Sequence, residues 1–128
     1  EELGVPLDPS LLIPLGTRLL ADDNGEGHNR ERVHVYFLLD DRPITAYNPP
    51  HDEVAGLVEI AASDLMAILA DPSHEVAAIS TETLTSTETT TSTETITRAD
   101  LVEGADGYWT VLAVMASRAL DGETLLAI

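Results

Sequence analysis

The chain has 128 residues, the usual size of one domain, and its formal net charge of −17 comes from 23 acidic residues against six arginines and no lysine. So negative a surface repels nucleic-acid phosphates and excludes a nucleic-acid partner, although a bound divalent cation can still bring in a small phosphate ester. The absence of cysteine excludes disulfides and thiolate metal sites, and no apolar run approaches the ~18 residues that span a bilayer, which excludes a membrane partner.

The first part of the chain predicts a bent strand and a hairpin connection. Residues 11–20 (LLIPLGTRLL) are apolar with β-compatible spacing, and Pro14 and Gly16 predict a bend within them. We expect this strand to start at a sheet edge, because proline cannot donate to a ladder. Residues 22–29 (DDNGEGHN) are dense in turn formers and predict a loop or hairpin connection.

Residues 30–40 predict the clearest strand, because side chains of two kinds alternate along them. The side chains expected to meet the core are Val33, Val35, Phe37 and Leu39. The other face carries Arg32, His34 and Tyr36, so we expect it to line a polar cleft. A turn is expected at residues 40–43 (DDRP).

A loop, a strand and a short helix follow in the middle of the chain. Residues 47–53 (YNPPHDE) predict a proline-stiffened acidic loop, and residues 54–60 (VAGLVEI) predict another strand. Ser63 is the expected N-cap of an amphipathic helix over residues 64–70 (DLMAILA), which should end before Pro72.

The last predicted element is a helix that Asp106 is expected to cap. Its apolar stripe should consist of Tyr108, Leu112, Met115 and Ala119. Arg118 and Gly122 mark its C-terminal end, where a cation and a left-handed glycine are favourable.

An internal repeat of three hexads, STETLT, STETTT and STETIT, occupies residues 80–97. Polar hexads of this kind cannot build a core of their own, and a solenoid would need more of them elsewhere in the chain. We therefore expect residues 80–97 to be a Thr-rich inserted surface loop, partly extended.

The chain opens with the pentapeptide EELGV, which resembles the closing half of the Nudix box, a pattern that ends in Arg-Glu-aliphatic-x-Glu-Glu-x-Gly-aliphatic. A glutamate three residues before Glu1 would share one helix face with Glu1 and Glu2, and carboxylates on one face make a hard oxygen site for Mg²⁺ or Mn²⁺. Gly4 would then end that helix in a left-handed conformation. The alternative is an ordinary acidic helix end with a glycine cap.

Two later segments are also similar to Nudix hydrolases. Residues 50–69 (PHDEVAGLVEIAASDLMAIL) resemble the family's recurrent acidic pair, short strand and N-capped helix. Residues 96–122 resemble the C-terminal extension of a subgroup that includes isopentenyl-diphosphate-isomerase-like proteins. The resemblance implies an α/β fold, an α/β/α sandwich of Nudix type with a mixed sheet, in which residues 1–128 form one domain that lacks the N-terminal portion of the fold.

This resemblance implies metal-assisted hydrolysis of a nucleoside diphosphate-linked or related pyrophosphate substrate. Glu1 and Glu2 would be ligands of Mg²⁺ or Mn²⁺, and Glu2 would also belong to the catalytic group. Glu53, or Asp52 beside it, would supply a further carboxylate as metal ligand or general base.

The cationic and aromatic side chains expected to contact the substrate are Arg18, Arg32 and Tyr36, since arginine binds phosphate and carboxylate groups. Each of them has an alternative role on an exposed strand face or beside nearby acids. The four histidines lack the helical spacing of a zinc site.

The opening half of the Nudix box is absent from the chain, which leaves alternatives open. Enzyme activity is expected if that half is encoded upstream; otherwise a non-catalytic Nudix-like binding or interaction module is the alternative. A prenyl-diphosphate isomerase ranks lower, because it typically requires a catalytic cysteine. Loss of the opening half would expose a core-facing surface, which predicts self-association, for example as a homodimer. We expect a cytoplasmic location, because no signal peptide opens the chain.

Overall fold

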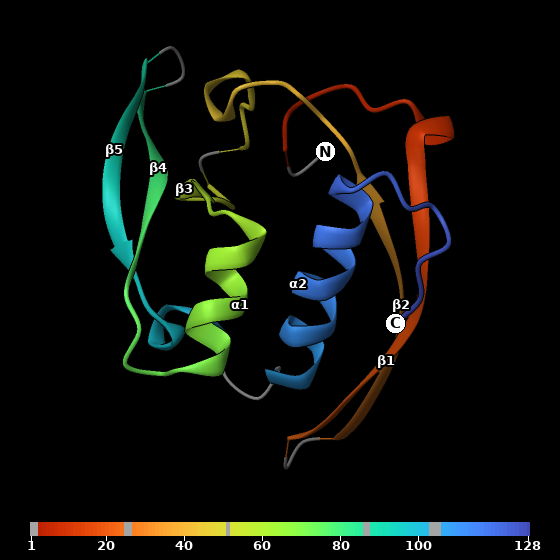
Figure 1. The fold of residues 1–128 in the computed structure, drawn as a ribbon. Helices are drawn as coiled ribbons and strands as arrows, with labels where there is room; N and C mark the ends of the chain where they lie inside the picture. Colours follow the sequence, from red (N-terminus) through yellow and green to blue (C-terminus); the bar gives the residue numbers. More distant parts are fainter. Residues whose placement is uncertain (1–2, 25–26, 51, 86–87, 103–105) are drawn as a thin grey trace.

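The computed structural model describes residues 3–24, 27–50, 52–85, 88–102 and 106–128, and within them it contains two antiparallel sheets and two α-helices (Figure 1). The strands are β1 (Leu12–Asn24), β2 (Gly27–Leu38), β3 (Gly56–Glu59), β4 (Val76–Thr85) and β5 (Glu88–Ile96). The helices are α1 (Ala62–Ala70) and α2 (Asp106–Leu120), with short 3-10 helices η1 (Pro9–Leu11), η2 (Ile44–Ala46) and η3 (Arg98–Asp100). The predicted α/β class is confirmed, and the architecture is consistent with a Nudix-type fold.

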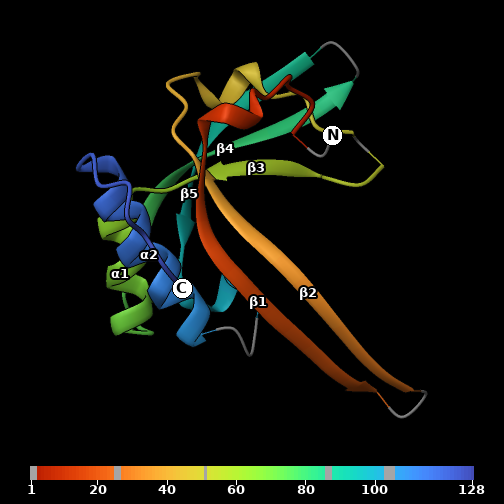
Figure 2. The same cartoon turned by 90° about the vertical axis from the view of Figure 1, so that its right-hand side faces the viewer.

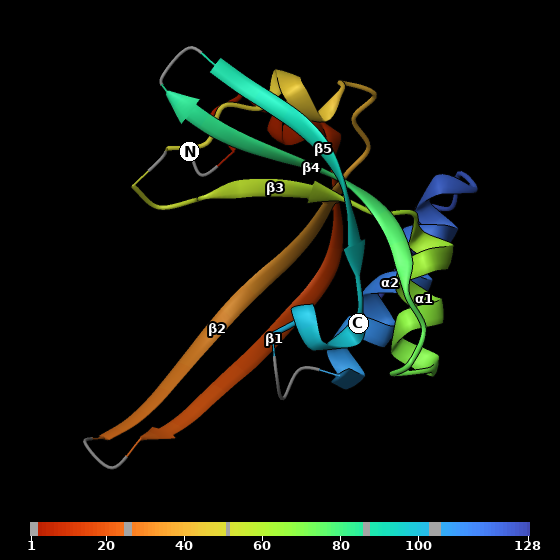
Figure 3. The same ribbon diagram turned by 90° about the vertical axis from the view of Figure 1, so that its left-hand side faces the viewer.

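β1 and β2 form a long two-stranded hairpin that reaches beyond the rest of the fold (Figures 2 and 3). Its register shifts between Pro14 and Gly16, so the predicted bend is confirmed. The strands continue to Asn24 and resume at Gly27, so the loop expected over residues 22–29 is wrong in extent. Turn-forming residues stay in the strands there because the hairpin ladder satisfies their backbone groups.

α2 covers one face of this hairpin, and the main core lies between them. Leu15, Ala119 and Leu126 are buried together. The partly buried side chains that pack against them are Ile13, Val35, Phe37, Leu112 and Met115. The alternating face of β2 and the stripe of α2 therefore meet as their periodicities predict.

The second sheet has the strand order β3-β4-β5, and the two helices lie between the sheets in Figure 1. All strand pairs among the described residues are antiparallel, so the mixed sheet that we expected does not form from these strands. For β1 with β2 and for β4 with β5 the reason is local, whereas β3 and β4 are joined through α1 and still pair antiparallel. Two residues separate β1 from β2, and two separate β4 from β5, whereas a parallel pair needs a crossover of about a dozen residues or more.

In the described part of residues 80–97 the Thr-rich hexads form strands, so the inserted loop expected there is wrong. They provide the end of β4 and all of β5, with Ser80 opposite Ser92 and their hydroxyls 2.9 Å apart. Thr81 is buried, and its hydroxyl accepts a hydrogen bond of 3.1 Å from the Leu57 amide of β3. Threonine is β-branched and fits a pleated sheet, so this composition favours strand once a neighbouring strand is present.

α1 begins two residues earlier than predicted, at Ala62. Ala61 occupies the N-cap position without a side-chain hydrogen bond, and Ser63 lies inside the first turn, so its expected capping role is wrong. The helix ends at Ala70, before Pro72 as predicted. The Arg98 guanidinium donates to the Leu69 carbonyl at 3.1 Å and so satisfies a carbonyl in the last turn.

α2 ends in the way that its sequence predicts. Gly122 has a φ of +88°, and its amide donates to the Ala119 carbonyl at 3.0 Å. The amide of Glu123 donates to the Arg118 carbonyl at 3.0 Å, which completes a Schellman motif. The helix begins at Asp106, whose expected role as a cap involves residues outside the described ones.

Candidate functional site

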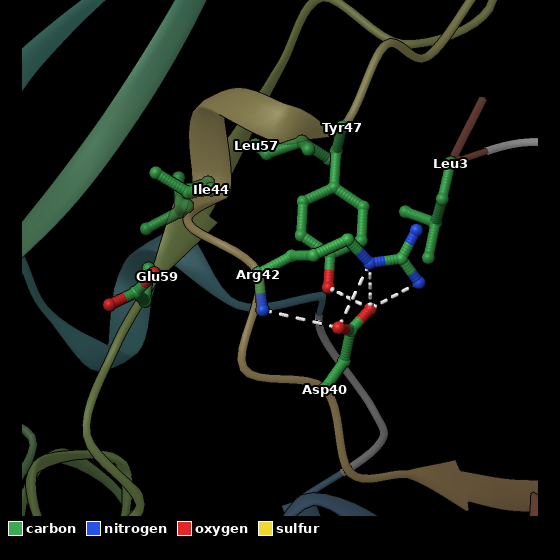
Figure 4. A pocket seen from close by; sticks show the side chains of 8 residues that line it. Leu3, Asp40, Arg42, Ile44, Tyr47, Leu57 and Glu59 are labelled. Carbon is green, nitrogen blue, oxygen red and sulfur yellow. Dashed lines mark hydrogen bonds and ion pairs between the residues drawn. The ribbon is translucent and has the colours of Figure 1, made fainter. Parts of the chain in front are cut away.

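A cleft of about 360 Å³ opens beside the N-terminal end of the described chain (Figure 4). Its lining consists of Leu3, Asp40, Arg42, Ile44, Tyr47, Leu57, Val58 and Glu59. Three parts of the sequence meet here: the opening residues, the segment that follows β2, and β3. Apolar walls with a few charged groups are typical of a small-molecule site.

Asp40 holds the guanidinium of Arg42 in a fixed orientation (Figure 4). Arg42 Nε lies 2.9 Å and 2.7 Å from the two Asp40 carboxylate oxygens, and Nη2 lies 2.5 Å from Oδ2. The Tyr47 hydroxyl donates to the same Oδ2 at 2.9 Å, and the guanidinium carbon lies 5.6 Å from the centre of the Tyr47 ring. The Asp40 side chain is 15% exposed and that of Arg42 36%, so the cation is the more accessible member.

These contacts also set the ionisation of the group. The hydrogen bonds from Arg42 lower the pKa of Asp40 to about 2, with a smaller contribution from Tyr47 and against the opposing effect of burial. The Asp40 carboxylate in turn raises the pKa of Arg42. Burial, and then the bond to Asp40, raises the pKa of Tyr47. At neutral pH the cleft therefore contains a charged, oriented guanidinium beside a neutral phenol.

The opening residues are attached to this cleft. The Asn48 amide donates to the Leu3 carbonyl at 3.1 Å. Gly4 has a φ of +65°, as its predicted left-handed role requires, and a Cβ on it would lie 1.7 Å from the Asn48 carbonyl oxygen. The proposed metal ligands Glu1 and Glu2, the residues directly before Leu3, lie outside the described residues.

The acidic loop contributes exposed carboxylates. Asp52 and Glu53 are both exposed, and the amides of Glu53 and Val54 donate to the Pro50 carbonyl at 3.1 Å and 2.9 Å. Neither side chain lines the cleft. In the part of the chain that the structure describes, no three histidine, aspartate or glutamate side chains gather as metal ligands.

The structure separates the three side chains expected to contact the substrate. Arg32 and Tyr36 are exposed on the outer face of β2, the face predicted to be polar. Arg18 pairs with Val33 and so lies on the opposite face, where its guanidinium carbon is 4.0 Å from the ring centre of Tyr108. A substrate bound across the outer face therefore meets Arg32 and Tyr36 but not Arg18.

Sequence reasoning missed Arg42, Asp40, Tyr47 and Glu59. The segment DDRP indicated only a turn, although an Asp two residues before an Arg is a usable signal. The Asp40 carboxylate accepts from the Arg42 amide at 3.1 Å, as in an Asx-turn, and that local bond directs the arginine side chain back toward it.

Comparison with known proteins supports one family. The chain is similar to a Nudix hydrolase. It is 35% identical over 69 residues to an uncharacterized Nudix hydrolase of Clostridium acetobutylicum. The alignment covers 54% of this chain and 34% of that relative, so the chain spans about one third of the Nudix relative's length.

Other comparisons add nothing to this similarity. No family model and no solved structure matches the chain. None of the helices in the described ranges has both the length and the apolarity needed to cross a membrane.

Proposed function

We propose that the chain is the C-terminal part of a Nudix-type pyrophosphohydrolase that acts on a nucleoside diphosphate-linked or related pyrophosphate. The observation that carries the proposal is the bond between Leu3 and Asn48, because it attaches the end of the EELGV motif to a cleft that contains an oriented guanidinium. The similarity to a Nudix hydrolase supports the family independently of this geometry.

In this proposal Glu1 and Glu2 would hold Mg²⁺ or Mn²⁺, since carboxylate oxygens suit hard divalent cations. The bound cation would neutralise the diphosphate and lower the pKa of the attacking water. Glu53, with Asp52 as the alternative, would act as the general base; it is exposed on the loop that follows Asn48, outside the lining of the cleft. Arg42 donates to a phosphate oxygen through the edge of its guanidinium that Asp40 leaves open.

The proposal is tested by hydrolysis of a panel of nucleoside diphosphate derivatives, with and without Mg²⁺. We expect the Glu1→Gln/Glu2→Gln double variant to lose at least 100-fold in metal-dependent kcat/KM, an effect within the range of a lost catalytic group. Glu75→Gln, which changes an exposed acid between α1 and β4, serves as the matched control and should hydrolyse normally. Unchanged metal affinity and hydrolysis in the double variant would remove the mechanism.

Diphosphate binding without turnover would instead support the non-catalytic module. The isopentenyl-diphosphate-isomerase-like subgroup, self-association as a homodimer and the cytoplasmic location stay predictions. Size-exclusion chromatography tests the self-association, and a monodisperse monomer would contradict it.

A further inference from the structure

The outer face of β2 presents four hydrogen-bond donors in a row, a set that we call the donor stripe: Arg30, Arg32, His34 and Tyr36. All four side chains are exposed. Their neighbours Val35 and Phe37 face the opposite way and pack toward α2. Because side chains alternate along a strand, the four donors follow each other at intervals of about 6.7 Å over roughly 20 Å.

No acidic residue lies opposite the donor stripe in the hairpin. The residues paired with its four members are Ala21, Leu19, Thr17 and Pro14. Thr17 Oγ1 lies 3.0 Å from His34 Nδ1, which fixes the orientation of that ring. The other cross-strand partners are apolar and offer the arginines no counter-charge.

Arg30 and Arg32 differ from Arg42 and Arg118 in having no ion-pair partner among the described residues. Arg42 and Arg118 form ion pairs with Asp40 and Glu123. No carboxylate of the described residues forms an ion pair with Arg30 or Arg32, in a chain that has 23 acidic residues. Two exposed, unneutralised guanidinium groups at this spacing are a surface for an anion.

We propose that the donor stripe is a second nucleotide-binding surface outside the cleft, with Arg30 and Arg32 on phosphate oxygens and the ring of Tyr36 against a planar group such as a nucleobase. Arginine presents a planar fork that matches phosphate geometry, and an exposed tyrosine ring supplies a stacking surface. β2 ends at Leu38, two residues before Asp40 of the cleft, so along the strand Tyr36 is the member of the stripe nearest to the cleft and Arg30 is the farthest from it. The identity of the anion as a phosphate rests on the proposed function.

The phosphate contacts are tested by calorimetric titration of inorganic diphosphate and of ADP without metal and at low salt. We expect the Arg30→Gln/Arg32→Gln double variant to bind both probes at least about tenfold more weakly, and affinity of the unmodified chain to fall with added salt. Arg118→Gln removes an exposed arginine at the far end of α2 and should bind both probes normally. Equal affinities in the unmodified chain and the double variant, with circular dichroism showing both folded, would overturn the proposal.

The stacking contact has its own test. Tyr36→Leu should weaken ADP about tenfold, as loss of a stacked base does, and leave inorganic diphosphate unaffected. Tyr36→Phe should restore ADP binding, because it keeps the ring. An equal loss for both probes, or no loss for ADP, would refute a stacking role for Tyr36.

The proposal for the donor stripe and the proposed hydrolase function can be refuted separately. If the unmodified chain binds ADP through these arginines but hydrolyses no diphosphate with Mg²⁺, the proposed function fails and the stripe stands. If it hydrolyses diphosphates but the arginine double variant binds ADP and inorganic diphosphate as tightly as the unmodified chain does, the stripe fails and the function stands.

Discussion

Gly4 and Gly122 provide a matched pair for testing how the opening residues are attached. Both have positive φ, +65° and +88°, so alanine at either position has the same unfavourable backbone conformation. The two glycines differ in the space that surrounds an added Cβ. A Cβ on Gly4 would lie 1.7 Å from the Asn48 carbonyl oxygen, whereas a Cβ on Gly122 would meet nothing within 4 Å.

The expected magnitudes follow from this difference. A left-handed alanine costs about 1–2 kcal/mol, and this is the whole expected loss for Gly122→Ala. Gly4→Ala has the same cost and a clash with rigid backbone that no rotamer relieves. The segment must move, which breaks the 3.1 Å bond between Leu3 and Asn48 and adds about 1 kcal/mol. We therefore expect Gly4→Ala to lose about 2–3 kcal/mol, with the loss bounded because the segment can detach.

Urea unfolding measures the two free energies, and amide hydrogen exchange of Asn48 locates the effect. In Gly4→Ala the Asn48 amide should lose its protection, and metal-dependent hydrolysis should fall because the opening residues leave the cleft. In Gly122→Ala both should stay as they are. Normal protection of Asn48 in Gly4→Ala, or equal stability losses in the two variants, would refute the attachment of the N-terminal segment to the cleft.

Three further predictions concern packing, pH and helix propensity. Leu15→Ala, in the cluster with Ala119, should lower the free energy of unfolding by about 2–5 kcal/mol at constant m-value in urea, and a loss below this range would contradict its place in the core. Arg42 holds the pKa of Asp40 at about 2, below the ordinary 3.8, so the stabilisation is present above pH 3.8 and lost as pH falls through about 2. The stability difference between the unmodified chain and Asp40→Asn should therefore shrink over that interval in acid titrations, and a constant difference would argue against the ion pair. Gly107→Ala, in α2 with nothing within 4 Å of the new Cβ, should raise stability by about 0.5–1 kcal/mol, and a lowered thermal midpoint would show that α2 does not form there.

The elements with strong periodicity were predictable from the sequence. β2 alternates as Val35 and Phe37 indicate, and α2 places Leu112 and Met115 on the hairpin. The C-terminal glycine of α2 was also predictable, because left-handed backbone at a helix end is a local requirement.

The hexads show where prediction of secondary structure from the local sequence fails. Their threonines and glutamates are polar on both faces, so periodicity distinguishes no buried side and a loop is the natural expectation. Thr81 is nevertheless buried under β3, whose Leu57 amide donates to it. A strand forms here because the neighbouring strands supply backbone partners, which the sequence of residues 80–97 does not reveal.

The candidate site, like the fold, was predictable from the sequence only in part. Arg32 and Tyr36 were singled out from the alternation of β2, and the structure keeps them on one exposed face. Arg18 was grouped with them by charge alone, and the register of the hairpin places it on the other face, against Tyr108. A one-residue difference in register reverses the face of every side chain, so such groupings need the strand pairing.

The sequence by itself determined the periodic strands and helices, the bend in β1, the absence of thiol chemistry and the acidic net charge, because each depends on residue type and on spacing within a short window. The tertiary structure alone decided the pairing of β3 with β4, the strand conformation of the hexads, and the meeting of Leu3 with Arg42 and Asp40. Those features join segments tens of residues apart, and their energies come from contacts that exist only once the chain has folded.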